Sequence, residues 1–107
     1  MDMSQNTATV DGGKKIIILC EKVSRDDIKV RFYDPHSQWE GWGDFKDSDV
    51  HKQYAITLKT PRYENQIIIE KRKILLQLVK PSDGTRSDPK EFYLLPLGME
   101  RKGIILV

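Results

Sequence analysis

The sequence predicts an all-β protein whose strands form an antiparallel sandwich, and three observations support this fold. Apolar and polar residues alternate along most of the 107-residue chain, which is the pattern of strands with one buried face. Short clusters of Asp, Gly, Pro and Ser separate the alternating runs, as turns do. No segment longer than about ten residues keeps the 3.6-residue period of an amphipathic helix.

The first three predicted strands cover residues 15–19, 28–33 and 39–45. The first is a β-branched run of strand length, KIIIL, which follows the turn sequence DGG. The second, IKVRFY, alternates apolar with polar side chains and ends at Asp34-Pro35. The third is weaker, because Gly41 and Gly43 bring no side chain to pack.

Three further strands are predicted at residues 54–60, 74–79 and 92–95. The segment SDVHKQ before them allows at most one helical turn, capped by Ser48. Thr60-Pro61 ends the first of these strands, and Pro81-Ser82-Asp83-Gly84 follows the second. About seven short strands in about 100 residues indicate an immunoglobulin-like sandwich.

Length and composition indicate a single soluble domain in a reducing, intracellular setting. Hydrophobic residues make up 38% of the chain and charged residues 32%, and no run approaches the roughly 18 apolar residues that cross a bilayer. The N-terminus lacks the features of a signal peptide, and the one cysteine cannot form an internal disulfide. The net charge is only +2, so any contact with a polyanion has to be local.

Candidate catalytic groups are few, and we expect neither an enzyme nor a cofactor or metal site. His36 and His51 lack the paired His and Cys spacing of a zinc site. Cys20 follows an apolar run and precedes Glu21, surroundings that do not lower a thiol pKa. The segment DGGKK lacks the residue order of a phosphate-binding loop.

The run IIIL is apolar on both faces, although a sandwich strand needs only one buried face. Ile16 and Ile18 lie on one face, and Ile17 and Leu19 lie on the other. Either a further element of this chain covers the second face or another chain does. A third explanation is that β-branched residues are present because they favour strands. In the strand 54–60, alternation puts Tyr54, Ile56 and Leu58 on one side and the small residues Ala55 and Thr57 on the other.

Four motifs occur in a fixed order between residues 19 and 63, namely LC-x-KV, WEG-x-GDF, DVH-x-Q-x-AI and KTP-x-Y, followed by SDPKEFYLLP. In this order they resemble the C-terminal half of the Rel homology region of NF-kappaB transcription factors. That half is the dimerization domain, an immunoglobulin-like sandwich also called IPT/TIG. The resemblance covers residues 12–96, and WEGWGDF is nearer the ankyrin-precursor, Relish-like subfamily. It implies that the chain is a fragment, because the N-terminal base-reading domain is absent.

The resemblance implies a symmetric dimer, formed with a second copy or with other Rel-family subunits. The positions of the family's dimer face are Ile17, Leu19, Tyr54, Ala55 and Thr57. The family usually has an aliphatic residue at the position of Thr57, so a hydroxyl here is expected to weaken the dimer or to alter partner choice.

The resemblance also implies contacts with the DNA backbone at kappaB-type sites, made together with the missing domain. The matching positions are Lys22, Lys52 and Gln53, with Arg25 as a further candidate. Ankyrin-repeat inhibitors of the IκB type are expected as partners, a membrane is not, and the location is expected to be both cytoplasmic and nuclear. The alternative is a cytosolic immunoglobulin-like interaction module without a nucleic-acid role.

Several remaining features are expected to be structural. His51 is expected to orient the loop before a strand, and Trp39 and Trp42 are expected to pack. The segment EKRK (70–73) is expected to be a solvated turn rather than a nuclear localisation signal. Residues 1–11 fit the family poorly. The tail 97–107 diverges from it and offers only Arg101 and Lys102 where the family has a basic cluster.

Overall fold

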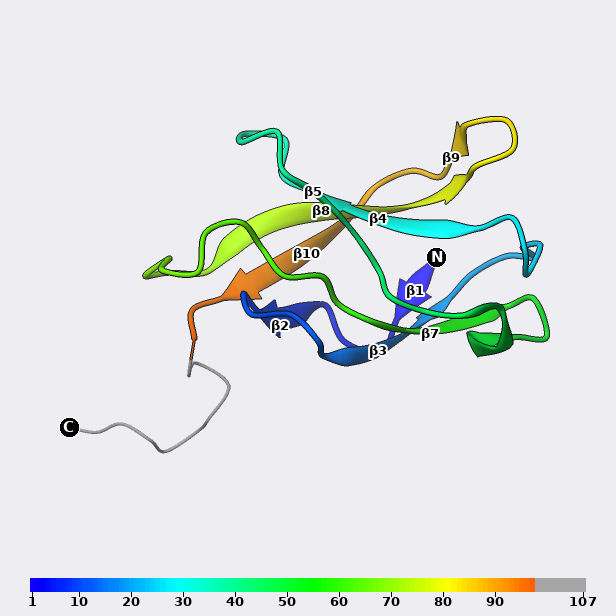
Figure 1. Ribbon diagram of the computed structural model, residues 1–107, viewed down its shortest axis with the longest axis horizontal. Coiled ribbons are helices and arrows are strands. Elements are labelled where there is room, and N and C mark those ends of the chain that lie inside the picture. Colours follow the sequence, from blue (N-terminus) through cyan, green and yellow to red (C-terminus); the bar gives the residue numbers. More distant parts are fainter. Residues whose placement is uncertain (98–107) are drawn as a thin grey trace.

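The computed structural model describes residues 1–97 of the chain, and these form two facing β-sheets (Figure 1). One sheet has four strands in the order β1 (Asp2–Met3), β3 (Lys15–Leu19), β7 (Ala55–Lys59) and β6 (Val50–His51). All of its strand pairs are antiparallel. The expected tail features Arg101 and Lys102 lie outside the described residues.

The second sheet has six strands. Five follow the order β2 (Thr7–Thr9), β10 (Lys90–Leu95), β8 (Arg72–Lys80), β4 (Lys29–Tyr33) and β5 (Glu40–Trp42), and β9 (Thr85–Arg86) pairs with β8. The predicted immunoglobulin-like sandwich is confirmed. One pair departs from the antiparallel pattern, because β2 runs parallel to β10. Within the described residues there is no helix long and apolar enough to cross a membrane.

The first eleven residues are part of the sandwich. They contribute β1 to the first sheet and β2 to the second, so the chain enters at one layer and crosses to the other. The weak strand predicted at residues 39–45 is shorter, Glu40–Trp42. Gly41 makes room there, since a Cβ at this position would lie 2.7 Å from the Trp39 ring.

A single 3₁₀ turn, η1 (Asp47–Asp49), precedes β6. Its start is held by the Asp49 carboxylate, which accepts a hydrogen bond from the backbone N–H of Lys46 at 2.9 Å. The helical turn predicted within SDVHKQ is therefore present only at the start of that segment, because η1 ends at Asp49 and Val50–His51 form β6. Ser48 as its cap is wrong. Ser48 lies inside the turn, where its side chain cannot cap the first N–H groups.

The core lies between the sheets and follows the predicted alternation. Ile16 and Ile18 point inward from β3, and Phe32 meets Phe92 edge to face with ring centroids 5.2 Å apart. The buried hydrophobic residues are Ala8, Val10, Ile16, Ile18, Val30, Phe32, Val50, Ile56, Leu58, Tyr63, Ile74, Leu76, Leu78, Val79, Phe92 and Leu94.

A buried carboxylate fixes the end of the sandwich where β4 ends and β8 begins. The side chain of Asp34 is fully buried and accepts hydrogen bonds from Tyr63 Oη at 2.6 Å, Arg72 Nε at 2.9 Å and the His36 N–H at 2.9 Å. The expectation that residues 70–73 form a solvated turn is therefore wrong at Arg72 and Lys73, which already belong to β8. This arginine begins β8 and neutralises the Asp34 carboxylate.

Candidate functional site

The outward face of the four-stranded sheet carries the candidate interaction surface. Ile17 and Leu19 on β3 point away from the core, and 41% and 53% of their surface is exposed. On the neighbouring strand, Leu19 lies opposite Ala55 and Ile17 lies opposite Thr57. We call these four residues the apolar face. Among the described residues, no further strand or helix of this chain covers it.

The hydroxyl of Thr57 has a partner in the same chain. His51 on the edge strand β6 places its Nε2 atom 3.2 Å from Thr57 Oγ1. His51 also lies opposite Ala55 in the register, so its imidazole borders the apolar face. The sequence predicted a structural role for His51 but not this contact, because residue spacing alone does not show that β6 pairs with β7.

Tyr54 is the one predicted dimer residue outside the strands. The sequence placed it on the inner side with Ile56, but 56% of its surface is exposed. The alternation fails there because β7 begins at Ala55, directly after a turn. The carbonyl of Tyr54 accepts a hydrogen bond from the Cys20 N–H at 2.8 Å, which holds this turn beside the end of β3.

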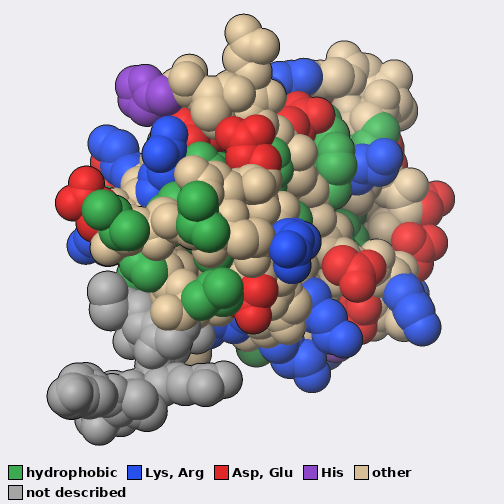
Figure 2. Space-filling model, turned by 60° about the vertical axis from the view of Figure 1, so that its left-hand side comes forward, with side chains coloured by type: hydrophobic (Ala, Val, Ile, Leu, Met, Phe, Trp, Pro, Cys, Tyr) green, Lys and Arg blue, Asp and Glu red, His purple; other side chains and the backbone are tan. Residues whose placement is uncertain are grey.

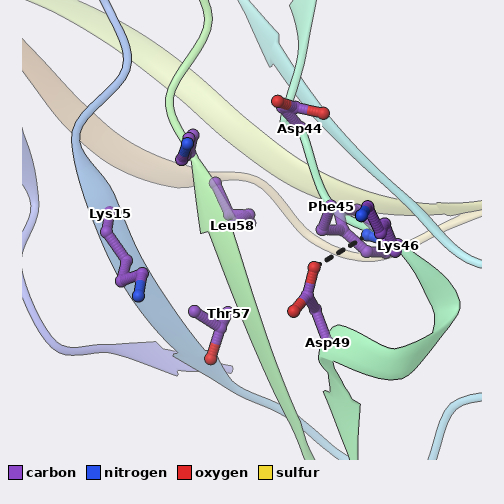
Figure 3. Close-up of a pocket in the computed structure, with 8 residues that line it drawn as sticks. Lys15, Asp44, Phe45, Lys46, Asp49, Thr57 and Leu58 are labelled. Carbon is purple, nitrogen blue, oxygen red and sulfur yellow. Dashed lines mark hydrogen bonds between the residues drawn. The ribbon is translucent and has the colours of Figure 1, made fainter.

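Charged residues lie at the two ends of the apolar face. At one end Lys15 lies directly opposite Lys59, and at the other end Asp2 lies opposite Leu19. Lys15, Lys46, Lys59, Asp44, Asp49 and Thr57 are among the residues that line a hollow of about 280 Å³ at the lysine end. Figure 3 shows Lys15 and Thr57 on neighbouring strands, with Asp49 approaching from η1.

The candidate phosphate-contacting residues lie on two loops at one end of the sandwich (Figure 1). Lys52 and Gln53 are the central residues of the β6–β7 turn, in which the Tyr54 N–H donates to the His51 carbonyl at 3.1 Å. Both have positive φ angles, 52° and 65°, as in a type I′ turn. The Val23 N–H donates to the Gln53 carbonyl at 2.9 Å and so brings the exposed Lys22 beside this turn. We call Lys22, Lys52 and Gln53 the basic edge.

Arg25 belongs to a different hollow, of about 420 Å³, which Asp26, Lys29 and Trp42 also line. Trp42 keeps 42% of its surface exposed, and the Lys29 ammonium lies 5.5 Å from its ring centroid. The expectation that both tryptophans pack is thus wrong for Trp42. It is right for Trp39, whose ring meets Tyr63 at 4.9 Å between centroids.

Two further exposed isoleucines do not belong to the apolar face. Ile67 and Ile69 are 83% and 91% exposed, but they lie on the loop before β8 rather than on a sheet face. Figure 2 shows this end of the molecule, where hydrophobic side chains stand among basic and acidic ones. An exposed loop with scattered apolar side chains offers no flat surface for a second sheet.

The two-layered sandwich with one uncovered apolar sheet face belongs to the class of immunoglobulin-like interaction domains. The model of the Rel homology dimerisation domain family matches residues 1–98. The chain belongs to this family, which is one of transcription factors. The matched range includes the first eleven residues, which form β1 and β2.

Proteins of similar sequence agree with this family assignment. The embryonic polarity protein dorsal of Drosophila melanogaster is 50% identical over 94 residues, which cover 85% of this chain and 9% of that protein. The nuclear factor NF-kappa-B p105 subunit of Mus musculus is 42% identical over 97 residues, covering 88% and 10%. The p110 subunit of Drosophila melanogaster is 37% identical over 108 residues, covering 97% and 11%. The chain thus spans about a tenth of these relatives.

The fold matches a solved structure as well. The solution structure of the TIG domain from human nuclear factor of activated T-cells, cytoplasmic 4, superposes with a TM-score of 0.78. The superposition covers 95% of this chain and 90% of the other, at 21% sequence identity. The predicted IPT/TIG fold is therefore confirmed.

Proposed function

We propose that this domain joins two subunits of a Rel-type transcription factor through the apolar face, as a homodimer or with other Rel-family subunits. The observation that carries the proposal is the exposure of Ile17 and Leu19, 41% and 53%, on a regular sheet face. The small neighbours Ala55 and Thr57 let a second sheet approach closely. In a two-fold dimer each of these residues acts twice, so a few side chains decide the affinity.

We further propose that the basic edge contacts the phosphate backbone of DNA. Lysine neutralises one phosphate and a glutamine amide donates without charge, and neither contact carries sequence information by itself. Arg25 stays a candidate, although it lines a separate hollow. Docking of IκB-type ankyrin-repeat inhibitors and a location in both cytoplasm and nucleus stay predictions from the family. The alternative function is an interaction module without a nucleic-acid role.

Sedimentation across a range of protein concentrations tests the dimer. We expect the unmodified chain to dimerize at micromolar concentrations and Ala55→Asp to dimerize at least roughly a hundredfold more weakly, because it buries two unpaired carboxylates near the axis. Ile69→Asp is the matched control, since it places the same charge at a position 91% exposed on a distant loop. A monomeric unmodified chain, or an equal effect of both variants, would rule out the apolar face as the interface.

A further inference from the structure

Trp42 is an exposed tryptophan at the end of β5, the edge strand of the six-stranded sheet. It lies opposite Arg31 in the register, on the outward side of the sheet, and 42% of its surface is exposed. Among residues 1–97 its indole N–H donates no hydrogen bond. A large aromatic side chain that keeps its ring and its polar atom open is typical of an interaction surface.

The Trp42 ring forms one wall of the hollow of about 420 Å³ described above. Its other apolar walls are Ile28 from the loop before β4, Phe45 from the segment after β5 and Pro81 from the turn after β8. This volume lies within the range of ligand pockets. No residue of the apolar face or of the basic edge lines the hollow, so a partner bound here would leave both surfaces free.

Hydrogen bonds between the surrounding segments hold the hollow in shape. The Asp27 carboxylate accepts hydrogen bonds from the Ser82 N–H at 3.0 Å and the Ser82 hydroxyl at 2.6 Å, which tie the loop before β4 to the turn after β8. The Gly43 N–H donates to the Val30 carbonyl at 2.9 Å and keeps the end of β5 beside β4. A site whose walls are already in place requires little ordering of the protein when a ligand binds.

The four charged residues that line the hollow favour a partner with a basic group. The Lys29 ammonium lies 5.5 Å from the Trp42 ring centroid, so this cation already has an aromatic partner. Arg25 is the candidate for a DNA phosphate. Asp26 and Asp47 also line the hollow, and within the described residues neither carboxylate forms an ion pair. Two carboxylates without a cation attract a base and repel the phosphates of a nucleic acid.

We infer that the hollow binds a proline-rich segment of another protein, in the polyproline II conformation, with a basic residue at one end. Such a segment has no internal backbone hydrogen bonds, so its carbonyl groups are free to accept one from the Trp42 indole N–H. Its preformed backbone loses little entropy on binding, and aromatic-lined grooves are the surfaces that bind it. Trp42, Phe45 and Pro81 supply the walls for the proline rings, and the basic residue pairs with Asp26 or Asp47.

A titration of the whole isotope-labelled chain, followed by nuclear magnetic resonance, tests the site. The chain contains two tryptophans, so the indole signal that is lost in Trp42→Phe belongs to Trp42. The probe is a peptide of about eight prolines followed by arginines. It should shift the Trp42 indole signal and leave that of Trp39 in place. Trp42→Ala should weaken the affinity about tenfold or more, because the ring and the donor are both removed.

Ile69→Ala is the matched control for the loss of an exposed apolar side chain. Ile69 is 91% exposed on a loop that does not line the hollow, so this variant should bind the peptide as the unmodified chain does. Ala55→Asp should also bind the peptide with unchanged affinity, because the apolar face lies outside the hollow. This second variant keeps the test separate from the proposed dimer.

Changes in the peptide test the chemistry of recognition. A peptide with glycine and serine in place of the prolines should not bind, since it lacks the preformed conformation. Alanines in place of the arginines should weaken binding about two- to fivefold, the usual contribution of an exposed ion pair. The variant Asp26→Asn, Asp47→Asn should bind the two proline peptides equally.

The opposite results would overturn the inference. An unmoved Trp42 signal, or equal affinity of the unmodified chain and Trp42→Ala, excludes the hollow as the site. Equal binding of the glycine and serine peptide excludes polyproline recognition. Tighter binding of a proline peptide that ends in glutamates, or of a single-stranded oligonucleotide, would mean that the hollow takes an acidic partner instead.

Discussion

At the scale of single residues, Asp34 shows how much a buried group depends on its partners. Burial by itself raises the pKa of this carboxyl group, but the hydrogen bonds from Tyr63, the His36 N–H and Arg72, with the charge of Arg72, together lower the pKa below its ordinary value. A lowered pKa in the folded state means that the ionised form stabilises the fold. This stability is complete above the pKa of the unfolded chain and is lost as the pH falls through the folded-state pKa.

We expect Tyr63→Phe to lower the free energy of unfolding at neutral pH by about 1.5–3 kcal/mol, because it removes a hydrogen bond to a buried charge. The pKa of Asp34 should then rise, so acid unfolding should begin at a higher pH than in the unmodified chain. Tyr33→Phe is the control, since this half-buried ring contacts Arg31 and its hydroxyl is not among the groups that donate to the Asp34 carboxylate. Urea unfolding monitored between about pH 2 and 7 measures both effects. Equal curves for the two variants would contradict the role given to Tyr63.

At the residue scale, the sequence predicted some side-chain positions correctly and missed others. The alternation correctly placed Ile17 and Leu19 on one face and Ile16 and Ile18 on the other, because a strand turns successive side chains to opposite sides. The contact between His51 and Thr57 was not predictable, since it depends on which strands pair and in which register. The ion pair of Arg72 with Asp34 was not predictable either, because in the sequence Arg72 is one of several charges in the run EKRK.

At the scale of elements, the β6–β7 turn combines strain with a candidate function. Lys52 and Gln53 both adopt positive φ angles, a conformation that costs a residue with a side chain roughly 1–2 kcal/mol. Glycine, asparagine or aspartate would suit the turn better. Backbone strain of this kind is common at functional sites. Here the two strained residues are two of the three residues in the basic edge.

Gln53→Gly is expected to stabilise the fold by up to about 1 kcal/mol and, in the factor with its N-terminal domain, to weaken DNA binding. The fold becomes more stable because glycine relieves the backbone strain. DNA binding becomes weaker because the side-chain amide is missing. Gln38→Gly is the matched control, because Gln38 also has a positive φ angle, 62°, on another loop. Thermal unfolding should show stabilisation in both variants, whereas DNA titration should change only with Gln53→Gly. An unchanged DNA affinity would exclude Gln53 from the contact.

At the scale of the whole molecule, the sandwich separates the two interaction surfaces of the proposed function. The apolar face occupies the outside of the four-stranded sheet, whereas the basic edge occupies the loops at one end of it (Figure 1). The proposed subunit pairing and the proposed phosphate contact would therefore use different surfaces. The sequence predicted this division through the family motifs and the unneeded second apolar face of β3. It could not predict the parallel pairing of β2 with β10, because the segment before Asp11 has little hydrophobic pattern.

The basic edge should affect DNA binding by the factor that contains both Rel homology domains. Lys22 and Lys52 should contribute phosphate contacts without base discrimination, since both lie on loops at the end of a sandwich. The variant Lys22→Ala, Lys52→Ala loses four charges per dimer. The slope of log affinity against log salt should therefore become shallower by up to about 0.9 for each lost contact.

The ranking of DNA sites should stay the same, because base contacts are expected from the other domain. Lys71→Ala, Lys73→Ala removes the same charge at the far end of the molecule and is the control, with Lys71 stacked on Tyr93 and Lys73 paired with Glu91. Titration across a salt series distinguishes the possibilities. A slope that does not change relative to this control would remove the basic edge from the DNA surface and favour the interaction module without a nucleic-acid role. A changed ranking of sites would mean that this domain reads sequence itself.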